Sequence, residues 1–505
     1  MTLSKTGGLI MKRNFKKMVC LLICTSVILT LLSITASANS AQMRWHGADS
    51  TGTVIVGENC PIEVTKEVLT LDVSELPINH YSTVDEYLAY TGKVTAEYTF
   101  YNPTDLTVTA TLAFPFGAQP GYARLKYDHW TFSYISADTE KYDITVNGEA
   151  VDKEIRYTLN TSGSTFELSK DLPKLSDTYI EDDFYYPGMT VTKYTYIVGG
   201  ENQEGPIDKA KYRSTVAAFD LSGGDGKTRI YFPKNSCFYR QKDGDGRFGT
   251  TANNRDEIVV YAFGQPLSTP LELKCYEYSA VEDGKEIDGI VSLISTETMT
   301  LEDLALEDWN KKIGISEIDW YNAKIAAFNE GGKHYTEYNY VDSFYYDGYT
   351  SADEFASSLM RWYQYEITLE PKSSVTNTVT APIYPAIDAR YVPTIFNYTY
   401  LLSPASTWAS FGELEIVVNT PFYITDNTID GFTKTDSGYT YKQSGLPSGE
   451  LEFTLCTDKN PRFQLYRGGI PIQLIVVITV VVLLLVVALI VVTVFMVIRK
   501  RKYRV

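Results

Sequence analysis

The sequence predicts a mainly β protein with two β-sandwich-like ectodomain parts, a small helical insert and one C-terminal transmembrane helix. Many short runs alternate apolar with polar residues, which indicates strands with one buried face. Turns rich in Gly, Asn and Asp separate these runs, and long α-helical patterns are few. The transmembrane helix follows from a third observation, a long uncharged segment near the end of the chain.

That segment is residues 474–498, and it contains no charged residue. As a helix it would be roughly 37 Å long, enough to cross a hydrocarbon core of about 30 Å with some tilt. Five cations follow it directly: Arg499, Lys500, Arg501, Lys502 and Arg504. Because cationic flanks stay in the cytoplasm, we expect a single-pass cell-membrane protein. Its N-terminal ectodomain would lie outside, and residues 499–505 would form a short cytoplasmic tail.

The N-terminus has the pattern of a secretory signal peptide. Lys12, Arg13, Lys16 and Lys17 precede an apolar run at 18–34, and Ala36-Ser37-Ala38 then supplies a cleavage site. We therefore assign residues 1–38 to a signal peptide and residues 39–469 to the exported region.

The exported region is strongly acidic. Ten of the 45 Lys and Arg residues, and none of the 62 Asp and Glu residues, lie in the two terminal segments, which leaves a net charge of −27 on residues 39–469. A surface of this charge repels phosphate backbones, so nucleic acid is excluded as a partner. Solubility is one explanation of the acidity, and Ca²⁺ binding is the alternative.

Residues 39–290 read as the first β-rich part. Two runs within 94–116 alternate about the turn cluster Asn102-Pro103-Thr104-Asp105, which predicts a hairpin. A second hairpin is predicted at 144–151, where Asn147-Gly148 suits a type I′ turn. Further strands are expected at 191–198, 229–233 and 257–263.

The periodicity then changes. Residues 291–362 read as a small helical subdomain, with helical spacing over 303–311 and 316–328 and a capping box at 351–354. Residues 363–460 read as a β-sandwich domain, with strands at 363–369, 375–383, 396–402, 414–418 and 451–455. Residues 461–473 would link it to the transmembrane helix.

Two resemblances rest on these segments. The run VTAEYTFYNPTDLTVTATLAFPFG at 94–117, with ITVNGEAV at 144–151, resembles the opening strands of VIT-type (vault and inter-α-trypsin) domains, here within 91–151. The closing part is similar to uncharacterised membrane-anchored surface proteins of Gram-positive bacteria: WYQYEITLEP at 362–371, YPAIDAR at 384–390 and YLLSPASTWASFG at 400–412. Neither resemblance supplies a catalytic residue.

Catalytic motifs are missing from the sequence. It has no G-x-S-x-G, H-E-x-x-H or paired C-x-x-C, and only four histidines. This pattern favours a non-enzyme but does not decide the question. Asp243 and Asp245, in the segment Asp-Gly-Asp-Gly at 243–246, are candidate Ca²⁺ ligands, although the EF-hand order fails at Arg247. The alternative is a solvated turn between strands.

Tyrosine provides the candidate binding surface. Residues 182–190 (DDFYYPGMT) match residues 342–350 (DSFYYDGYT) at six of nine positions. Tyrosine offers rigid, amphipathic contact area that suits glycan or protein recognition. We therefore expect an aromatic and acidic contact surface built from Asp182, Tyr185, Tyr186, Asp342, Tyr345 and Tyr346. The alternative is ordinary core and edge tyrosine in a tyrosine-rich chain.

Four cysteines follow the signal peptide: Cys60, Cys237, Cys275 and Cys456. Export to an oxidising compartment permits disulfides, and Cys237 and Cys275 are close in sequence, so we predict that they pair. Buried free thiols are the alternative.

These observations favour a surface protein whose ectodomain serves binding, adhesion or envelope architecture, with a glycan, the cell wall or another surface protein as partner. The alternative is an envelope carbohydrate-active hydrolase that uses carboxylates not identified by any motif.

Overall fold

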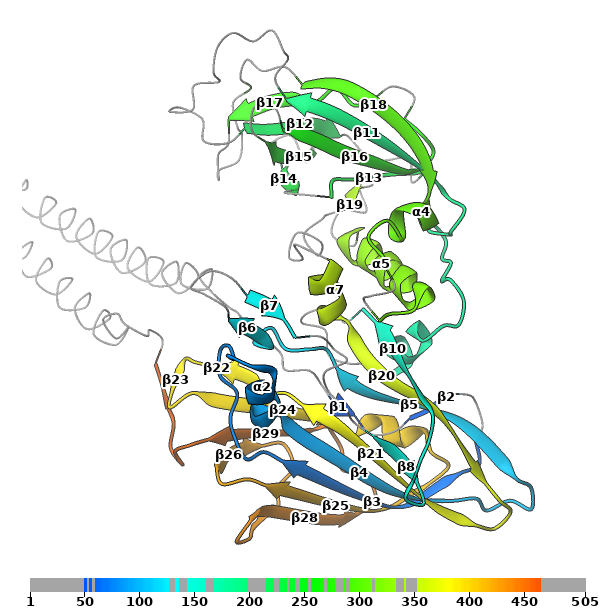
Figure 1. Ribbon diagram of the computed structural model, residues 1–505, viewed down its shortest axis with the longest axis vertical. Helices are drawn as coiled ribbons and strands as arrows, with labels where there is room; N and C mark the ends of the chain where they lie inside the picture. The colour runs from blue at the N-terminus through cyan, green and yellow to red at the C-terminus, as the bar shows by residue number, and fades with distance from the viewer. Residues whose placement is uncertain are drawn as a thin grey trace, which may run out of the picture. The chain divides into compact units, whose positions relative to one another are not determined.

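The computed structural model describes most of the chain between residues 50 and 464 (Figure 1). The described ranges are 50–51, 54–56, 60–126, 132–135, 143–159, 168–198, 215–221, 227–233, 236–240, 246–252, 256–267, 270–277, 286, 291–310, 314–332, 340–341 and 352–464. The predicted signal peptide and transmembrane helix lie outside them. Within these ranges, no helix combines the length and the apolar character needed to cross a membrane.

An eight-stranded sheet forms one layer of a main sandwich. Its strand order is β27 (Thr433–Lys434), β28 (Gly438–Ser444), β25 (Phe411–Asn419), β3 (Glu63–Asp72), β4 (Gly92–Tyr101), β21 (Ser374–Ile383), β8 (Ile144–Val146) and β9 (Glu149–Ala150). The pair β25 and β3 is parallel and the other pairs are antiparallel. This sheet therefore joins strands from the two ends of the described chain.

Two smaller sheets form the opposite layer. One has the order β10 (Lys153–Thr158), β20 (Met360–Leu369), β5 (Val108–Gly117) and β2 (Val54–Val56). The other has the order β1 (Ser50–Thr51), β24 (Ile395–Leu401), β29 (Leu451–Cys456) and β26 (Tyr423–Asn427), and β22 (Ala386–Asp388) also pairs with β24. Two short ribbons, β6 (Arg124–Lys126) with β7 (Phe132–Tyr134) and β23 (Tyr391–Val392) with β30 (Arg462–Phe463), complete this part.

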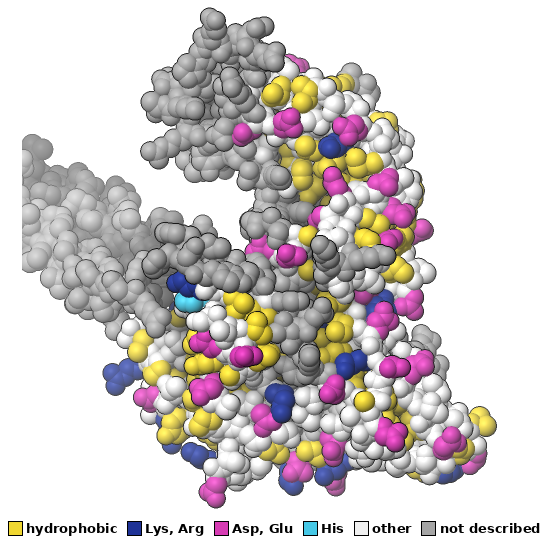
Figure 2. Space-filling view, viewed as in Figure 1, with side chains coloured by type: hydrophobic (Ala, Val, Ile, Leu, Met, Phe, Trp, Pro, Cys, Tyr) yellow, Lys and Arg dark blue, Asp and Glu magenta, His cyan; other side chains and the backbone are white. Residues whose placement is uncertain are grey.

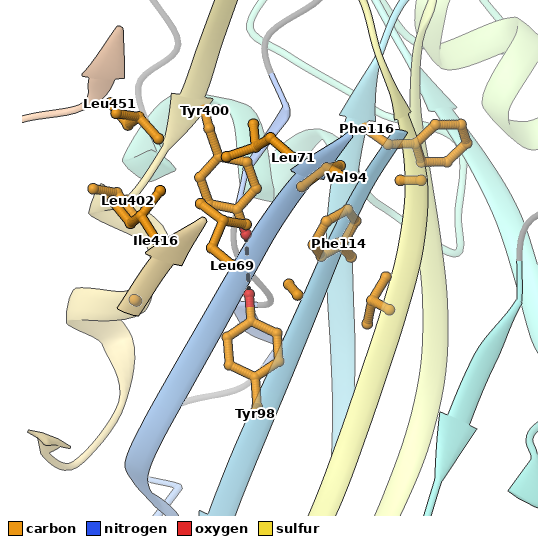
Figure 3. Packing of buried hydrophobic residues seen from close by; sticks show 14 of the residues in the cluster. Leu69, Leu71, Val94, Tyr98, Phe114, Phe116, Tyr400, Leu402, Ile416 and Leu451 are labelled. Carbon is orange, nitrogen blue, oxygen red and sulfur yellow. Dashed lines mark hydrogen bonds between the residues drawn. The ribbon is translucent and has the colours of Figure 1, made fainter. Parts of the chain in front are cut away.

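The core of the main sandwich lies between these layers (Figure 3). Alternate residues of each long strand point into it, as strand geometry requires. On β4 these are Val94, Ala96, Tyr98 and Phe100, all fully buried. Aromatic residues fill much of the space, and the Tyr98 and Tyr400 hydroxyls lie 3.2 Å apart across the layers.

The first predicted hairpin is wrong in its pairing, although both of its strands exist. β4 pairs with β3 and β21, whereas β5 pairs with β20 and β2, so the two strands belong to opposite layers. The turn between them is an arch that crosses the core. Asn102 holds this arch: its side-chain amide donates to the carbonyls of Leu106, Leu369 and Glu370, at 2.7, 3.2 and 3.1 Å. Both strands thus bury the same kind of alternating face without bonding each other.

The second predicted hairpin is confirmed. β8 and β9 pair antiparallel, with Val146 opposite Glu149. Asn147 and Gly148 between them have φ of 51° and 83°, the positive values that a type I′ turn requires.

A second sandwich is formed by two further sheets. The first has the order β18 (Val291–Thr300), β11 (Thr190–Val198), β16 (Glu257–Gly264), β13 (Thr228–Tyr231) and β19 (Tyr340–Val341). The second has the order β14 (Ser236–Arg240), β15 (Gly246–Ala252), β12 (Thr215–Leu221) and β17 (Lys274–Glu277). Tyr194, Val260 and Phe248 are among the residues buried between them.

The longest described helix, α5 (Glu317–Gly332), has two buried faces. Tyr321, Ile325 and Phe328 pack against the sheet that contains β11, together with α4 (Leu301–Ala305). Trp320 on another face packs with α7 (Ala352–Ser358) and β10. The predicted helix at 316–328 is therefore confirmed. The other helical segments among the described residues are α2 (Val84–Tyr90), α3 (Leu168–Asp171), η2 (Leu172–Lys174) and η5 (Ser403–Thr407).

The predicted fold class holds for the described residues: the protein is mainly β, with two sandwiches and a few helices. The sheets group the chain differently from the predicted domain ranges. Strands from 63–158 and 360–456 share sheets in the main sandwich, and residues between β10 and β20 form the second sandwich and the helices. The second sandwich and the helical part are thus inserted into the first.

Candidate functional site

One outer sheet face in the main sandwich is only half covered. On β20, Tyr363, Tyr365 and Ile367 point into the core, so Trp362, Gln364 and Glu366 point outward. The register places Glu154 of β10 opposite Gln364, and Thr111 of β5 opposite Glu366. A polar row therefore crosses this outer face.

The apolar half of this face is covered by the segment around η2. Leu172 and Leu175 pack on Ala113, Met360 and Trp362, and the Trp362 Nε1–H donates to the Thr158 hydroxyl at 2.8 Å. After Leu175 the segment continues along the rim of the polar half, where Asp177 lines a groove that stays open. The local sequence explains this boundary, because the outward residues change from apolar to polar between Trp362 and Gln364.

The open half is a groove of about 730 Å³. It is lined by Thr111, Val151, Asp152, Lys153, Glu154, Leu175, Asp177, Gln364, Tyr365 and Glu366. Four of these residues carry carboxylates, against a single lysine. The Lys153 ammonium lies 3.6 Å from Asp143 and is thus already paired. The groove therefore presents net negative charge to solvent.

A buried guanidinium fixes two groups of the groove. The Arg156 side chain donates from Nη1 to Asp177 Oδ1 at 2.8 Å and to Gln364 Oε1 at 2.9 Å. From Nη2 it donates to the Ser176 carbonyl at 2.7 Å and to Asp319 at 2.9 Å, and Nε also donates to Asp319. The five N–H groups all have acceptors. Since the Asp177 side chain is 84% exposed, it meets solvent in a fixed orientation.

Two further carboxylates lie on neighbouring strands of the floor. Glu154 and Glu366 are diagonal neighbours in the register, and the Cβ atoms of such a pair lie about 7 Å apart. Both side chains are exposed, and the Thr111 hydroxyl is 3.4 Å from Glu366. The arrangement suits ligand cations or hydroxyl groups. Figure 2 shows the wider setting, with Asp and Glu side chains spread over the visible face and fewer Lys and Arg.

The predicted tyrosine surface is only partly described. Tyr186 is 48% exposed and remains available for contact, but the Tyr185 ring is fully buried, between Phe263 and Phe328 and beneath Arg229. Tyr185 therefore serves packing and does not present its ring to a ligand. Burial raises its pKa to about 12. The side chains of these two consecutive tyrosines point in opposite directions, Tyr185 into the core and Tyr186 toward solvent. The repeated sequence did not indicate this difference.

Asp182 has a structural role in the same turn. Its carboxylate accepts the backbone N–H groups of Phe184 and Tyr185, at 2.7 and 2.6 Å, and the Asn329 amide at 2.7 Å. Partial burial favours the protonated form, but these hydrogen bonds and the charge of Arg229 outweigh it and lower the pKa of Asp182.

The remaining predicted site residues lie outside the described ranges. These are Asp342, Tyr345 and Tyr346 of the second tyrosine segment, and the candidate Ca²⁺ ligands Asp243 and Asp245. In the part of the chain that the structure describes, no cluster of three or more His, Cys, Asp or Glu residues is arranged to hold a metal ion.

The predicted Cys237–Cys275 disulfide is wrong. Cys275 is a buried free thiol, as is Cys456. In the sheet order β14-β15-β12-β17, two strands separate the strand of Cys237 from that of Cys275. Three strand spacings amount to about 14 Å between the backbones, twice the Cα separation that a disulfide spans. Closeness in sequence did not translate into neighbouring strands.

The sequence did not predict the groove residues as a site. They come from four segments, around 111, 151–154, 175–177 and 364–366, and no motif links them. A partial signal was present: Glu366 occupies an outward position of a strand whose other face is apolar. That pattern identifies a solvent face but not its neighbours.

No protein-family model matches the sequence, and the search of curated proteins found no match. One solved structure, from Legionella pneumophila, is described provisionally as that of a nutrient-binding protein. It aligns with 81% of this chain and 71% of its own, with 10% sequence identity and a TM-score of 0.26. A similarity this small carries no argument about fold or function.

Proposed function

We propose that this protein is a single-pass surface protein whose β-rich ectodomain binds a cationic ligand in the groove between Glu154, Asp177 and Glu366. The anchor in this proposal is the uncharged segment 474–498, with its five following cations. The ligand class follows from charge: four carboxylates line the groove, of which only Asp177 is paired with a cation, Arg156, and the lysine of the groove is paired with Asp143. A lysine- or arginine-bearing segment of another surface protein fits this chemistry best.

One observation carries the proposal. The sheet face is sealed by Leu172 and Leu175 over its apolar half and left open over its polar half, where Arg156 holds Asp177 and Gln364 in place. Fixed polar groups lose little conformational freedom when a ligand binds, which favours affinity.

The test uses the full chain in lipid nanodiscs and a pentalysine peptide as probe. We expect saturable binding that weakens with salt and falls about five-fold for each of Glu154→Gln and Glu366→Gln, since one lost charge contact contributes roughly 1 kcal/mol. Glu97→Gln is the matched control, because Glu97 is also an exposed glutamate in mid-strand. If none of the three substitutions changes the affinity for pentalysine, the proposal is contradicted.

The spacing of Glu154 and Glu366 also favours a second candidate, a carbohydrate-active hydrolase. Inverting glycosidases hold two carboxyl groups roughly 6.5–9.5 Å apart. Glu154 and Glu366 occupy diagonal positions on neighbouring strands, whose Cβ atoms lie about 7 Å apart, so their side chains start from a comparable separation. Incubation with a neutral N-acetylglucosamine hexamer separates the candidates. Release of reducing ends that is lost in Glu366→Gln supports hydrolysis, and an intact oligomer rejects it for this substrate.

A further inference from the structure

A pocket lies at one end of the main sandwich, where two loops cross between its layers. Residues 428–432 lead from β26 to β27, and residues 445–450 lead from β28 to β29. β26 and β29 belong to one layer, and β27 and β28 belong to the other (Figure 1). The strand pairs β27 with β28 and β26 with β29 are antiparallel, which brings both loops to the same end. The pocket between the loops measures about 500 Å³, within the range of roughly 300–1,000 Å³ that is typical of small-molecule sites.

The two loops are held together through Thr428. Its backbone N–H donates to the Glu452 carbonyl at 2.9 Å, and its hydroxyl donates to the Glu450 carbonyl at 2.7 Å and accepts the Glu452 N–H at 2.8 Å. The Glu450 carboxylate in turn accepts the backbone N–H groups of Leu402 and Ser403 through Oε2. The pocket is therefore preformed, and a ligand does not have to order these loops when it binds.

One side of the pocket is aromatic and apolar. Tyr441 of β28 lies opposite Ile416, a core residue of β25, so its ring faces the space between the layers. The ring is half-buried and packs on Phe432, with ring centres 5.5 Å apart. It lines the pocket together with Ile429, which is only 7% exposed. The Tyr441 hydroxyl donates to Gln443 Oε1, which fixes the orientation of the ring.

The other side of the pocket carries hydrogen-bond acceptors. The Asp430 and Glu452 side chains are exposed, and Oε1 of Glu450 remains as an acceptor because both N–H groups bond Oε2. The described residues that line the pocket include no Lys, Arg or His, so no cation of the lining occupies these carboxylates. Since an ionised carboxylate can only accept hydrogen bonds, a ligand has to supply the donors.

We propose that this pocket binds a neutral sugar ring. One face of a pyranose consists of C–H groups, which pack on the electron-rich face of an aromatic ring such as that of Tyr441. The edge of the pyranose carries hydroxyl groups, which donate to Asp430 and Glu452 in charge-assisted hydrogen bonds. An anionic ligand is repelled by the three carboxylates, and a purely apolar ligand would bury them without hydrogen bonds.

This pocket shares no lining residue with the groove between Glu154, Asp177 and Glu366. The sugar pocket and the cation-binding groove are thus separate sites, and either proposal can fail without the other.

The test is saturation-transfer difference NMR of the full chain in lipid nanodiscs, with the methyl pyranosides of glucose, galactose, mannose and N-acetylglucosamine as probes. We expect at least one probe to receive saturation, most strongly at the C–H protons of one ring face. Asp430→Asn and Glu452→Gln should each weaken the binding of that probe about five-fold, because a charge-assisted hydrogen bond becomes a neutral one. Tyr441→Leu should abolish the preference for one ring face.

Asp436→Asn and Tyr423→Leu are the matched controls, because both residues are exposed in the same part of the sandwich and do not line the pocket. They should leave pyranoside binding unchanged, as should Glu154→Gln in the groove, and circular dichroism should show that every variant folds.

Two results overturn the proposal. The first is that no pyranoside receives saturation, or that Asp430→Asn and Glu452→Gln both bind the probe as tightly as wild type. The second uses choline as a fifth probe: saturation of choline that is lost in Asp430→Asn, with none on the pyranosides, assigns the pocket to a cation instead of a sugar.

Discussion

Two buried carboxyl groups, Asp319 of α5 and Glu67 of β3, have contrasting hydrogen-bond surroundings. Both side chains are almost completely inaccessible to solvent. Asp319 receives Nε and Nη2 of Arg156 and also the backbone N–H of Tyr157 at 3.0 Å. Glu67 interacts with neutral tyrosine hydroxyls only: it accepts a hydrogen bond from Tyr400 at 3.3 Å and also interacts with Tyr98, and its Oε2 has no hydrogen-bond partner among the described residues.

The difference lies in what the surroundings offer to a buried acid. A guanidinium offers a buried carboxylate a countercharge and several hydrogen-bond donors. Tyrosine hydroxyls offer only neutral donors. Burial therefore dominates at Glu67 and raises its pKa to about 7, although the hydrogen bonds of Tyr98 and Tyr400 lower it somewhat. The first acid joins elements as an ion pair, and the second behaves as a neutral polar group over much of the acidic range.

Breaking the ion pair should have the largest effect. Arg156→Met leaves Asp319 buried without its countercharge, and we expect the free energy of unfolding to fall by about 3–5 kcal/mol. Chemical denaturation of the full chain in nanodiscs measures this. Adding Asp319→Leu to Arg156→Met should recover much of the loss, because no uncompensated charge remains. Arg390→Met, at an exposed pair, should cost less than about 1 kcal/mol. A loss at Arg156 as small as that at Arg390 would contradict this account.

The neutral character of Glu67 predicts a pH dependence of stability. Its pKa is higher in the folded than in the unfolded protein, so folding favours the protonated form. The stabilisation is complete below about pH 4.5 and is lost as the pH rises to about 7. A rise in pKa from 4.5 to about 7 corresponds to about 3 kcal/mol. Glu67→Gln should remove this dependence, so the difference between wild type and variant, measured by denaturation from pH 4 to 8, isolates it. Parallel curves would show that Glu67 ionises freely.

A buried polar group without charge provides an intermediate case. Asn102 is fully buried, and its carbonyl oxygen accepts the N–H and hydroxyl of Thr104, at 3.0 and 2.7 Å, while its amide donates to three carbonyls. Asn102→Ala leaves these groups unpaired and should cost about 2 kcal/mol in thermal or chemical denaturation. Asn427→Ala, whose side-chain oxygen has no partner among the described residues, serves as comparison and should cost less.

The arch at Asn102 also shows how far the sequence determines the fold. Alternation located β4, β11, β16 and β21 to within one or two residues, because a half-buried strand must place apolar residues at every second position. Alternation does not reveal the partner of a strand. β4 and β5 bury matching faces in opposite layers, and a hairpin would give the same sequence pattern.

Long-range pairing explains why the candidate site was not predicted. β3 pairs in parallel with β25, more than 340 residues later, and the groove combines residues from 111 to 366. Which outward-facing carboxylates converge depends on these registers. The Asn147-Gly148 turn was predictable, because its backbone angles follow from two adjacent residues alone.

The smallest expected effect concerns a buried hydroxyl that, unlike the Glu67 carboxyl group, has no hydrogen bond at all among the described residues. Tyr398 is fully buried in the main sandwich, stacks on Phe453 with ring centres 5.2 Å apart, and its hydroxyl has no hydrogen-bond partner among the described residues. Tyr398→Phe keeps the ring and removes only the unpaired polar atom. We expect stability to stay within about 0.5 kcal/mol of wild type or to rise slightly in denaturation. Tyr365→Phe, which removes a hydroxyl bonded to Asn377 at 2.8 Å, should instead cost about 1–2 kcal/mol. If both substitutions lower the free energy of unfolding by the same amount, then hydrogen bonding does not determine how much a buried polar group in this core contributes to stability.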